Sequence, residues 1–302
     1  MTGGEASRNG APQQWTVLPL VAWAEQYLRE RSFDEARLNA ELLLARALGV
    51  KRLQLYLQFD RPLTAGELGA FRALFLRRLA HEPVQYVLGE AEFMGLALEV
   101  NPAVLIPRPE TEELVEDALA WLRGRGAEGA RILEMGTGSG NIACALGAFL
   151  PRAHITTVDV SPGATDVARR NCARNGVGNV EFLTGDFGAT DFPRGAFDLL
   201  VANPPYVSAA EYARLDAEVR EFEPAGALTD GGDGLSFVRM IASRARSLLA
   251  PGGGMFVEIG AGQETDGLAI AREAGLDAVS VKKDFAGIGR ILRGFAPGES
   301  AP

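Results

Sequence analysis

The fold is decided by the stretch Arg131-Ile132-Leu133-Glu134-Met135-Gly136-Thr137-Gly138-Ser139-Gly140-Asn141. Its short apolar run predicts a buried strand over Arg131–Met135, and three glycines at alternate positions then predict a tight turn into a helix. The spacing GxGxG differs from the GxGxxG of dinucleotide-binding turns, because residue 141 is Asn. The stretch also lacks the Lys-Ser/Thr pair of a P-loop. A glycine turn can be no more than a turn, so a ligand site needs a second feature.

Strand and helix signals alternate from this stretch onward. Ser161 followed by Pro162 is a typical helix start, with an N-cap and a proline at the first helical position. Such alternation predicts an α/β domain whose mostly parallel sheet is covered on both faces and binds ligands at the carboxyl ends of its strands. The seven predicted strands are Arg131–Met135, His154–Val158, Val180–Leu183, Phe197–Val201, Gly254–Glu258, Ala278–Lys282 and Gly289–Gly294.

The chain that precedes this region has a different pattern. Over residues 15–84 apolar residues recur at three and four, which predicts a domain of four or five helices; Thr64 with Glu67 forms a capping box, and Ser32-Phe33-Asp34 is expected to open the second helix. Residues 85–104 contain short apolar pieces separated by glycine, which predicts a β-hairpin linker. The α/β domain is then expected over 105–296, with disordered or frayed tails at 1–14 and 297–302.

Composition excludes several classes of protein. The chain has 302 residues, a net charge of −9, 47% hydrophobic and 23% charged residues, which is typical of a globular protein and not of a disordered one. No apolar run approaches a membrane span, and the N-terminus has no apolar core of a secretory signal. The two cysteines cannot form a disulfide scaffold, so a cytoplasmic location is expected. Without a basic stripe, nucleic acid is disfavoured as the main partner.

Acidic and aromatic residues follow the next two predicted strands. Asp159 lies 23 residues after Gly136, where a carboxylate can accept hydrogen bonds from both hydroxyls of a ribose; the alternative is a helix-capping role beside Ser161. In Thr184-Gly185-Asp186-Phe187, Phe187 can pack on an adenine ring, although this segment could also be an ordinary turn. A glycine turn with an acidic strand end indicates a nucleoside-bearing ligand without a pyrophosphate. S-adenosylmethionine fits that description, and no metal is expected.

The tetrapeptide Asn203-Pro204-Pro205-Tyr206 directly follows another predicted strand. Its prolines fix the backbone so that the Asn203 side chain and the Pro204 carbonyl can accept both N–H bonds of one –NH₂ group. An amide nitrogen is a poor nucleophile because its lone pair is delocalised, so holding both hydrogens aims that lone pair at a methyl donor. Tyr206 can pack against the planar group. This motif favours nitrogen methylation, with S-adenosylhomocysteine as the product.

Over residues 20–294 the chain resembles the PrmC (HemK) family of protein-(glutamine-N5) methyltransferases, which modify the glutamine of the Gly-Gly-Gln motif in peptide chain release factors. The motif Asn203–Tyr206 also occurs in adenine-N6 DNA methyltransferases, so the resemblance depends on the combination of motifs. Besides that motif and the glycine turn, the matching segments are Pro83–Gly89, Glu92-Phe93, Leu105–Glu112, Phe222-Glu223-Pro224 and Ala286-Gly287-Ile288.

The resemblance implies a fold, a site and a partner. The fold is a class I S-adenosylmethionine-dependent methyltransferase, with a Rossmann-like seven-stranded sheet, joined to a helical domain that docks class 1 release factors. Loops around Arg108 and Glu223 would line the pocket. The residues implied to bind the cofactor are Gly136, Thr137, Gly138, Ser139, Gly140, Asp159, Phe187 and Asn203. The glutamine would be held by Asn203, Pro204, Pro205 and Tyr206, with Asn203, Pro204 and Tyr206 as the catalytic residues.

Three alternatives compete with this interpretation. An adenine-N6 methyltransferase acting on DNA or RNA would share the chemistry, but flipping a base requires a grip on phosphates that this acidic chain does not suggest. A non-catalytic module that binds a nucleoside would have no use for the acceptor pair of Asn203 and Pro204. A nicotinamide oxidoreductase is disfavoured by the glycine spacing.

Overall fold

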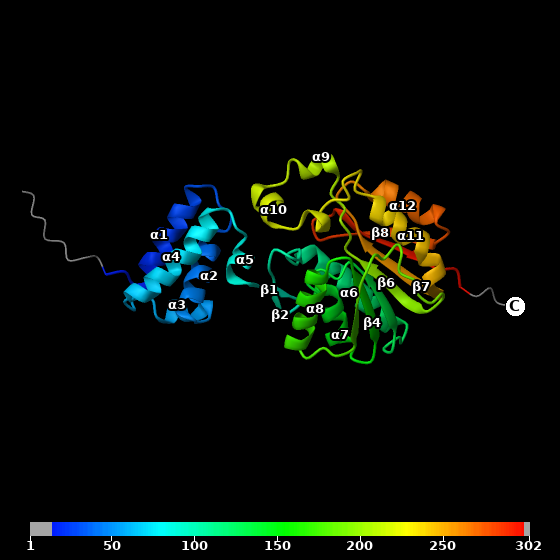
Figure 1. Cartoon of the computed structure of the whole chain (residues 1–302), viewed down its shortest axis with the longest axis horizontal. Helices are drawn as coiled ribbons and strands as arrows, with labels where there is room; N and C mark the ends of the chain where they lie inside the picture. The colour runs from blue at the N-terminus through cyan, green and yellow to red at the C-terminus, as the bar shows by residue number, and fades with distance from the viewer. Residues whose placement is uncertain (1–13, 299–302) are drawn as a thin grey trace, which may run out of the picture. The chain divides into compact units, whose positions relative to one another are not determined.

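The computed structural model describes residues 14–298, and the chain divides between Leu88 and Gly89 into two compact units (Figure 1). Of the predicted tails, residues 1–13 and 299–302 lie outside the described residues. Among the residues that are described, no helix is both long and apolar enough to cross a membrane.

The first unit consists of helices around one apolar core that includes Leu28, Leu43 and Phe71. The predicted capping box is present, since Thr64 N donates to Glu67 Oε2 at 2.8 Å and Glu67 N donates to Thr64 Oγ1 at 3.2 Å. The five helices described in this unit are α1 (Val17–Arg29), α2 (Ala36–Leu48), α3 (Arg52–Leu57), α4 (Ala65–Leu79) and α5 (Val84–Leu88).

Two sequence expectations for this part of the chain are corrected. Ser32-Phe33-Asp34 does not open the second helix, because Ser32 (φ 60°) and Glu35 (φ 48°) adopt left-handed conformations and α2 begins only at Ala36. The predicted hairpin segment 85–104 begins with helix instead, since residues up to Leu88 belong to α5. The hairpin itself is shorter, with β1 (Glu90–Phe93) paired to β2 (Leu96–Glu99).

The second unit contains a seven-stranded sheet in the order β5-β4-β3-β6-β7-β9-β8. The pairs from β5 to β7 are parallel, whereas β9 is antiparallel to both of its neighbours. This confirms the predicted α/β class, and every predicted strand is present. Their bounds are β3 (Arg131–Met135), β4 (His154–Asp159), β5 (Val180–Thr184), β6 (Phe197–Ala202), β7 (Leu249–Glu258), β8 (Asp277–Lys283) and β9 (Gly289–Phe295).

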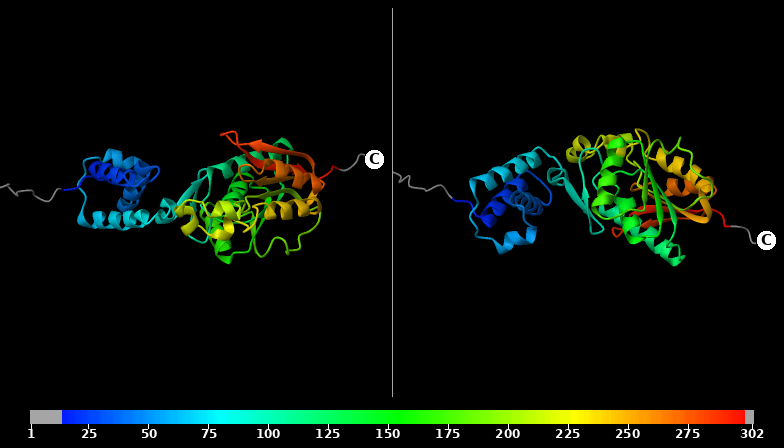
Figure 2. Two further views of the ribbon diagram at one scale, coloured as in Figure 1. Left: turned by 90° about the horizontal axis from the view of Figure 1, so that it is seen from above. Right: turned by 60° about the horizontal axis from the view of Figure 1, so that its bottom comes forward.

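Helices cover both faces of this sheet (Figure 2). Alternate residues of β3 show the division: Ile132 packs in one core with α6 (Pro109–Gly124), α7 (Asn141–Phe149) and α8 (Pro162–Arg174). Leu133 packs in the other core with α11 (Ser236–Leu248) and α12 (Glu264–Glu273). The remaining short helices are α9 (Ala209–Tyr212), α10 (Ala217–Phe222) and the 3₁₀ turn η1 (Ala225–Ala227).

Candidate active site

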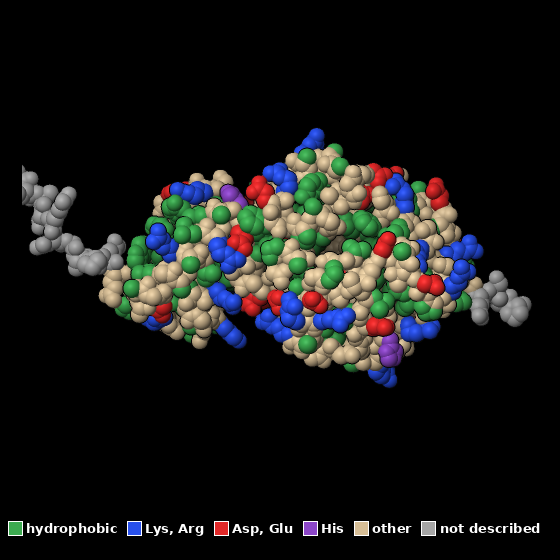
Figure 3. All heavy atoms as spheres, viewed as in Figure 1, with side chains coloured by type: hydrophobic (Ala, Val, Ile, Leu, Met, Phe, Trp, Pro, Cys, Tyr) green, Lys and Arg blue, Asp and Glu red, His purple; other side chains and the backbone are tan. Residues whose placement is uncertain are grey.

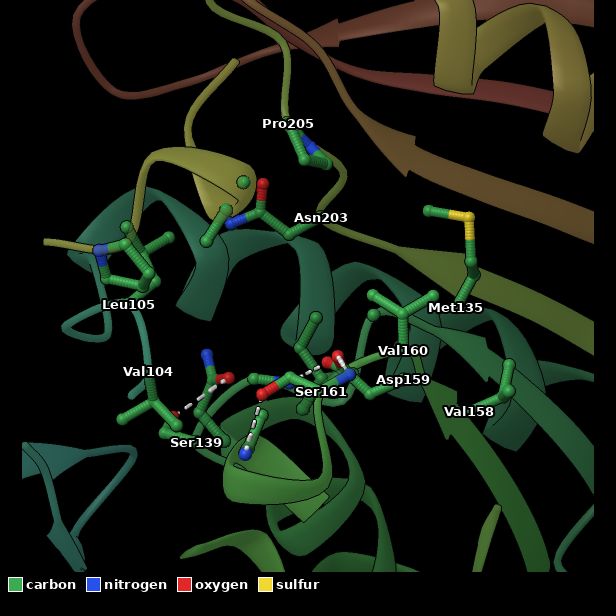
Figure 4. A pocket seen from close by; sticks show the side chains of 18 of the residues that line it. Val104, Leu105, Met135, Ser139, Val158, Asp159, Val160, Ser161, Asn203 and Pro205 are labelled. Atoms are coloured by element: carbon green, nitrogen blue, oxygen red, sulfur yellow. Dashed lines mark hydrogen bonds between the residues drawn. The ribbon is translucent and has the colours of Figure 1, made fainter. Parts of the chain in front are cut away.

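A pocket opens at the carboxyl ends of the central strands, where β3 lies between β4 and β6. The chain runs outward from β3 to β5 and then returns to the other side of β3 at β6, so this is the point at which strand order reverses. In Figure 4, Asn203 lies across the pocket from Ser139 and Asp159. The wall also includes apolar side chains that the sequence did not indicate, among them Met135, Val160, Phe237 and Met240.

The glycine turn contributes to the pocket through only some of its residues. Gly136, Gly138 and Ser139 line the wall, and the two glycines have φ values of 82° and 52°, which L side chains rarely adopt. Thr137 and Gly140 are not part of the lining. The Thr137 hydroxyl points inward to the Thr157 hydroxyl at 2.7 Å, and Gly140 caps α7.

Gly140 is required by the packing of two helices. A Cβ at this position would lie 2.8 Å from the Cβ of Ala168 in α8, closer than real side chains approach. Its φ of 79° adds a second reason for glycine. Thr137 and Gly140 were both predicted to touch the cofactor; in the structure both are buried and neither is part of the pocket lining.

Asp159, the predicted ribose ligand, lines the pocket at the end of β4. Its Oδ2 accepts from Gly138 N at 2.9 Å, and its Oδ1 accepts from Ser161 N at 2.8 Å. Each carboxylate oxygen keeps a second lone pair, so both can also accept a ligand hydroxyl. These two backbone hydrogen bonds hold the Asp159 carboxylate in place for the predicted ribose contact. The bond from Ser161 N also supports the alternative in which Asp159 stabilises the start of the next helix.

Phe187 contributes less surface than expected. It lines the pocket but is only 4% exposed, packs against Phe192 with ring centroids 5.7 Å apart, and has the Arg244 guanidinium carbon 5.0 Å from its ring centroid. A base in the pocket would meet a small part of this ring. The apolar side chains, the strand-end N–H groups and the carboxylate of Asp159 therefore fit S-adenosylmethionine, which carries a flat adenine ring and a ribose.

The residues after β6 divide between the pocket and the protein interior. Asn203 and Pro205 line the wall, whereas Pro204 is buried and Tyr206 lies outside the lining. The Tyr206 hydroxyl donates to Glu258 Oε1 at 3.3 Å, and burial raises the pKa of that hydroxyl. The predicted packing of Tyr206 on the substrate amide is therefore not visible in this arrangement.

Asn203 belongs to a buried hydrogen-bond chain that the sequence analysis missed. Asn203 Nδ2 donates to Thr111 Oγ1 at 2.9 Å, and Thr111 Oγ1 donates to Glu258 Oε2 at 2.7 Å. Thr111 is 0% exposed and Glu258 is 1% exposed. A charged residue closing the apolar run of β7 is the signal that could have pointed to Glu258.

Burial decides the protonation of Glu258. Loss of hydration raises its pKa to about 7, although the hydrogen bonds from Thr111 and Tyr206 and the charge of Arg290 act in the opposite direction. The carboxyl group therefore changes charge near neutral pH.

An ion pair joins two loops that border the pocket. The Arg108 guanidinium pairs with the Glu223 carboxylate, and Ile106 N donates to Glu223 Oε2 at 3.1 Å. Glu223 is 5% exposed, so the pair ties the loop before α6 to the segment after α10. Both loops reach the lining, through Arg108 and through Pro224. Within residues 14–298 no group of three His, Cys, Asp or Glu side chains could hold a metal ion.

Comparisons with known proteins agree with this geometry. Residues 19–89 match the family described as PrmC N-terminal domain, and residues 132–223 match the family described as methyltransferase domain. A release factor glutamine methyltransferase of Geobacter sulfurreducens is 43% identical over 94% of this chain and 98% of its own. One of Chlorobaculum tepidum is 44% identical over 92% of this chain and 96% of its own. The crystal structure of a Pyrococcus furiosus methyltransferase shares the fold, with 22% identity and a TM-score of 0.50 over 75% of this chain and 98% of its own.

Fold, pocket and family match together define a class I S-adenosylmethionine-dependent methyltransferase. Relatives above 40% identity along nearly their whole length narrow the class further. The chain belongs to the release factor glutamine methyltransferase family, as its resemblance to PrmC predicted.

Proposed function

We propose that this protein methylates the N5 nitrogen of the glutamine in the Gly-Gly-Gln motif of class 1 peptide chain release factors. The single observation that carries the chemistry is the position of Asn203, which lines the same pocket as the glycine turn and Asp159 and lies across it from them. The family relatives named release factor glutamine methyltransferase support the choice of acceptor.

Cofactor binding would use the residues that line the pocket at the ends of β3 and β4. Gly136, Gly138 and Ser139 offer close backbone approach, and Asp159 accepts the ribose hydroxyls. Thr137 and Gly140 would support this turn from below, and Phe187 would offer the edge of its ring to the base. S-adenosylmethionine, when bound, supplies an electrophilic methyl group on a sulfonium sulfur.

The acceptor nitrogen would be held by the segment after β6. The Asn203 side-chain oxygen and the Pro204 carbonyl would accept the two N–H bonds of the glutamine amide, while Pro205 forms part of the wall. Two acceptors polarise the N–H bonds and fix the nitrogen, so positioning provides most of the rate gain. Tyr206 would act from behind the wall through its bond to Glu258.

The helical unit would dock the release factor. Helix α3 exposes two large apolar side chains, Leu53 (71% exposed) and Leu57 (74%), and Phe59, two residues after the helix, is 53% exposed. Such a surface suits a protein partner. On the face drawn in Figure 3, basic and acidic side chains are interspersed and form no basic stripe. We infer a cytoplasmic protein whose main partner is not nucleic acid.

The test offers purified protein and methyl-labelled S-adenosylmethionine to three acceptors. These are a class 1 release factor, the same factor with its Gly-Gly-Gln glutamine changed to alanine, and unmethylated DNA. We expect label in the intact factor alone. Label in the alanine variant would mean a different acceptor residue, and label in DNA would support the adenine-N6 alternative and overturn the proposal.

A further inference from the structure

We propose, building on the function proposed above, that Thr111 and Glu258 are positioning residues that determine which end of the Asn203 amide faces the substrate nitrogen. An asparagine amide has an acceptor end and a donor end of nearly the same shape. Only the acceptor end can hold an –NH₂ group, so the reaction requires the amide to be fixed in one of two orientations.

The direction of donation along the hydrogen-bond chain fixes the orientation of the Asn203 amide. An ionised carboxylate can only accept, so the Thr111 hydroxyl must donate its single hydrogen to Glu258 Oε2, 2.7 Å away. The Thr111 oxygen then has only lone pairs left for Asn203, and it accepts from Nδ2 at 2.9 Å. The Asn203 oxygen is thereby left to face the pocket, whose wall this side chain forms.

If Glu258 is protonated, the direction of donation along this hydrogen-bond chain is no longer fixed. A protonated carboxyl can donate to Thr111, which then can donate to the Asn203 oxygen and turn the amide –NH₂ toward the substrate. The groups around Glu258 are the Thr111 and Tyr206 hydroxyls, the Arg290 guanidinium and the Glu110 carboxylate. Of these, Thr111, Tyr206 and Arg290 favour the ionised form, and Glu110 opposes it. Turnover should therefore rise with pH through about 7, where Glu258 loses its proton.

The first experiment removes the hydroxyl and then restores it. In Thr111→Val the shape is kept but the hydroxyl is lost, and we expect kcat for a release factor to fall about 10- to 100-fold, the effect of one buried hydrogen bond. Thr111→Ser should recover most of the loss. Thr165→Val is the matched control, because Thr165 is equally buried but does not line the pocket, and it should keep kcat. Unchanged kcat in Thr111→Val would overturn the proposal.

The second experiment uses the pH profile, which a merely structural role would not move. In Glu258→Gln the titrating group is gone, so the rise of kcat through about pH 7 should disappear. S-adenosylmethionine affinity measured by calorimetry should be unchanged in both variants, because Thr111 bonds to Asn203 and Glu258 bonds to Thr111 and Tyr206, and neither bonds to the glycine turn or to Asp159. If kcat of Glu258→Gln rises with pH as that of the parent protein does, the role of Glu258 is refuted.

The two proposals fail in different ways. If the parent protein labels no release factor, the proposed function fails. If it labels the factor, and Asn203→Ala is inactive while Thr111→Val and Glu258→Gln behave as the parent protein does, only the positioning chain fails.

Discussion

Asp159 is the residue whose proposed role is easiest to isolate. Replacing it by alanine removes the acceptor for two hydroxyls and for the Gly138 and Ser161 N–H groups. We expect S-adenosylmethionine binding to weaken by about 1–3 kcal/mol, the cost of leaving buried partners unpaired. Isothermal calorimetry measures this directly. Asp159→Asn keeps one acceptor oxygen, so its affinity should lie between those of the parent protein and Asp159→Ala. Unchanged affinity in Asp159→Ala would remove Asp159 from the ribose site.

Two buried carboxyl groups make the stability of the second unit depend on pH. Burial raises the pKa of Glu134 to about 8, and the hydrogen bond from Thr157 only partly offsets this; the pKa of Glu258 is raised to about 7. Both pKa values in the folded protein lie above the value of about 4.5 in the unfolded chain. At pH values between about 4.5 and the folded-state pKa, the folded protein therefore binds more protons than the unfolded chain does. The free energy of unfolding should therefore be highest near pH 5 and fall as pH rises toward 8.

A glutamine substitution tests that dependence. Glu134 has the larger pKa shift, so Glu134→Gln removes most of the pH dependence of stability. At pH 8 the free energy of unfolding of the variant should exceed that of the parent protein by at least about 1 kcal/mol, the energy of a pKa shift of one unit. Near pH 5 the difference should shrink. Urea unfolding at several pH values gives the comparison, and parallel curves for the two proteins would contradict the prediction.

At this scale the sequence indicated the residues that follow strands and missed those that meet only in three dimensions. Gly136, Asp159 and Asn203 stand at strand ends, so each could be predicted from its own segment. Thr111 and Glu258 are 147 residues apart in the chain, and nothing local connects them. Thr137 shows what the motif does not reveal, since its hydroxyl bonds to the Thr157 hydroxyl inside the protein.

At the scale of the elements, the packing of the start of α7 against α8 leaves no room for a larger side chain at Gly140. Gly140→Ala would force a Cβ to within 2.8 Å of the Ala168 Cβ at a φ of 79°. We expect a loss of about 2–4 kcal/mol in unfolding free energy, from overpacking and backbone strain together. Chemical denaturation of the protein without ligand measures it.

Two further variants separate the causes. Gly138→Ala has a positive φ of 52° but no neighbour within 4 Å of an added Cβ, so it should lose only about 1–2 kcal/mol, the cost of strain. Adding Ala168→Gly to Gly140→Ala should recover part of the loss. No recovery in that double variant would show that the contact with the Ala168 Cβ is not the cause of the loss.

Sequence patterns predicted the elements well where the period was regular. All seven strands were located, because each contains a short apolar or alternating run bounded by turn residues. Errors occurred at positions that depend on backbone conformation, such as the left-handed Glu35 before α2. A five-residue helix such as α5 is too short to show a helical period, and so Tyr86–Leu88 resembled a strand.

The whole molecule should unfold in two steps. One apolar core lies entirely within the helical unit, and two lie entirely within the second unit, so each unit has its own cooperative core. Calorimetry should show two transitions. Adding S-adenosylmethionine at about 100 times its Kd should stabilise only the second unit, by about 2.7 kcal/mol. A single transition, or an equal shift of both, would show that the units are coupled.

The position of β9 has a consequence for how the protein is made. Gly289–Phe295 is inserted between β7 and β8, although both of those strands precede it in the chain. On the ribosome, the helical unit can fold while later residues are still being added, but β7 and β8 must wait with a missing neighbour until β9 emerges. During that interval both strands expose unpaired edges, which are sites of aggregation. The sheet of the newly made chain can therefore be completed only after residue 295 has left the ribosome.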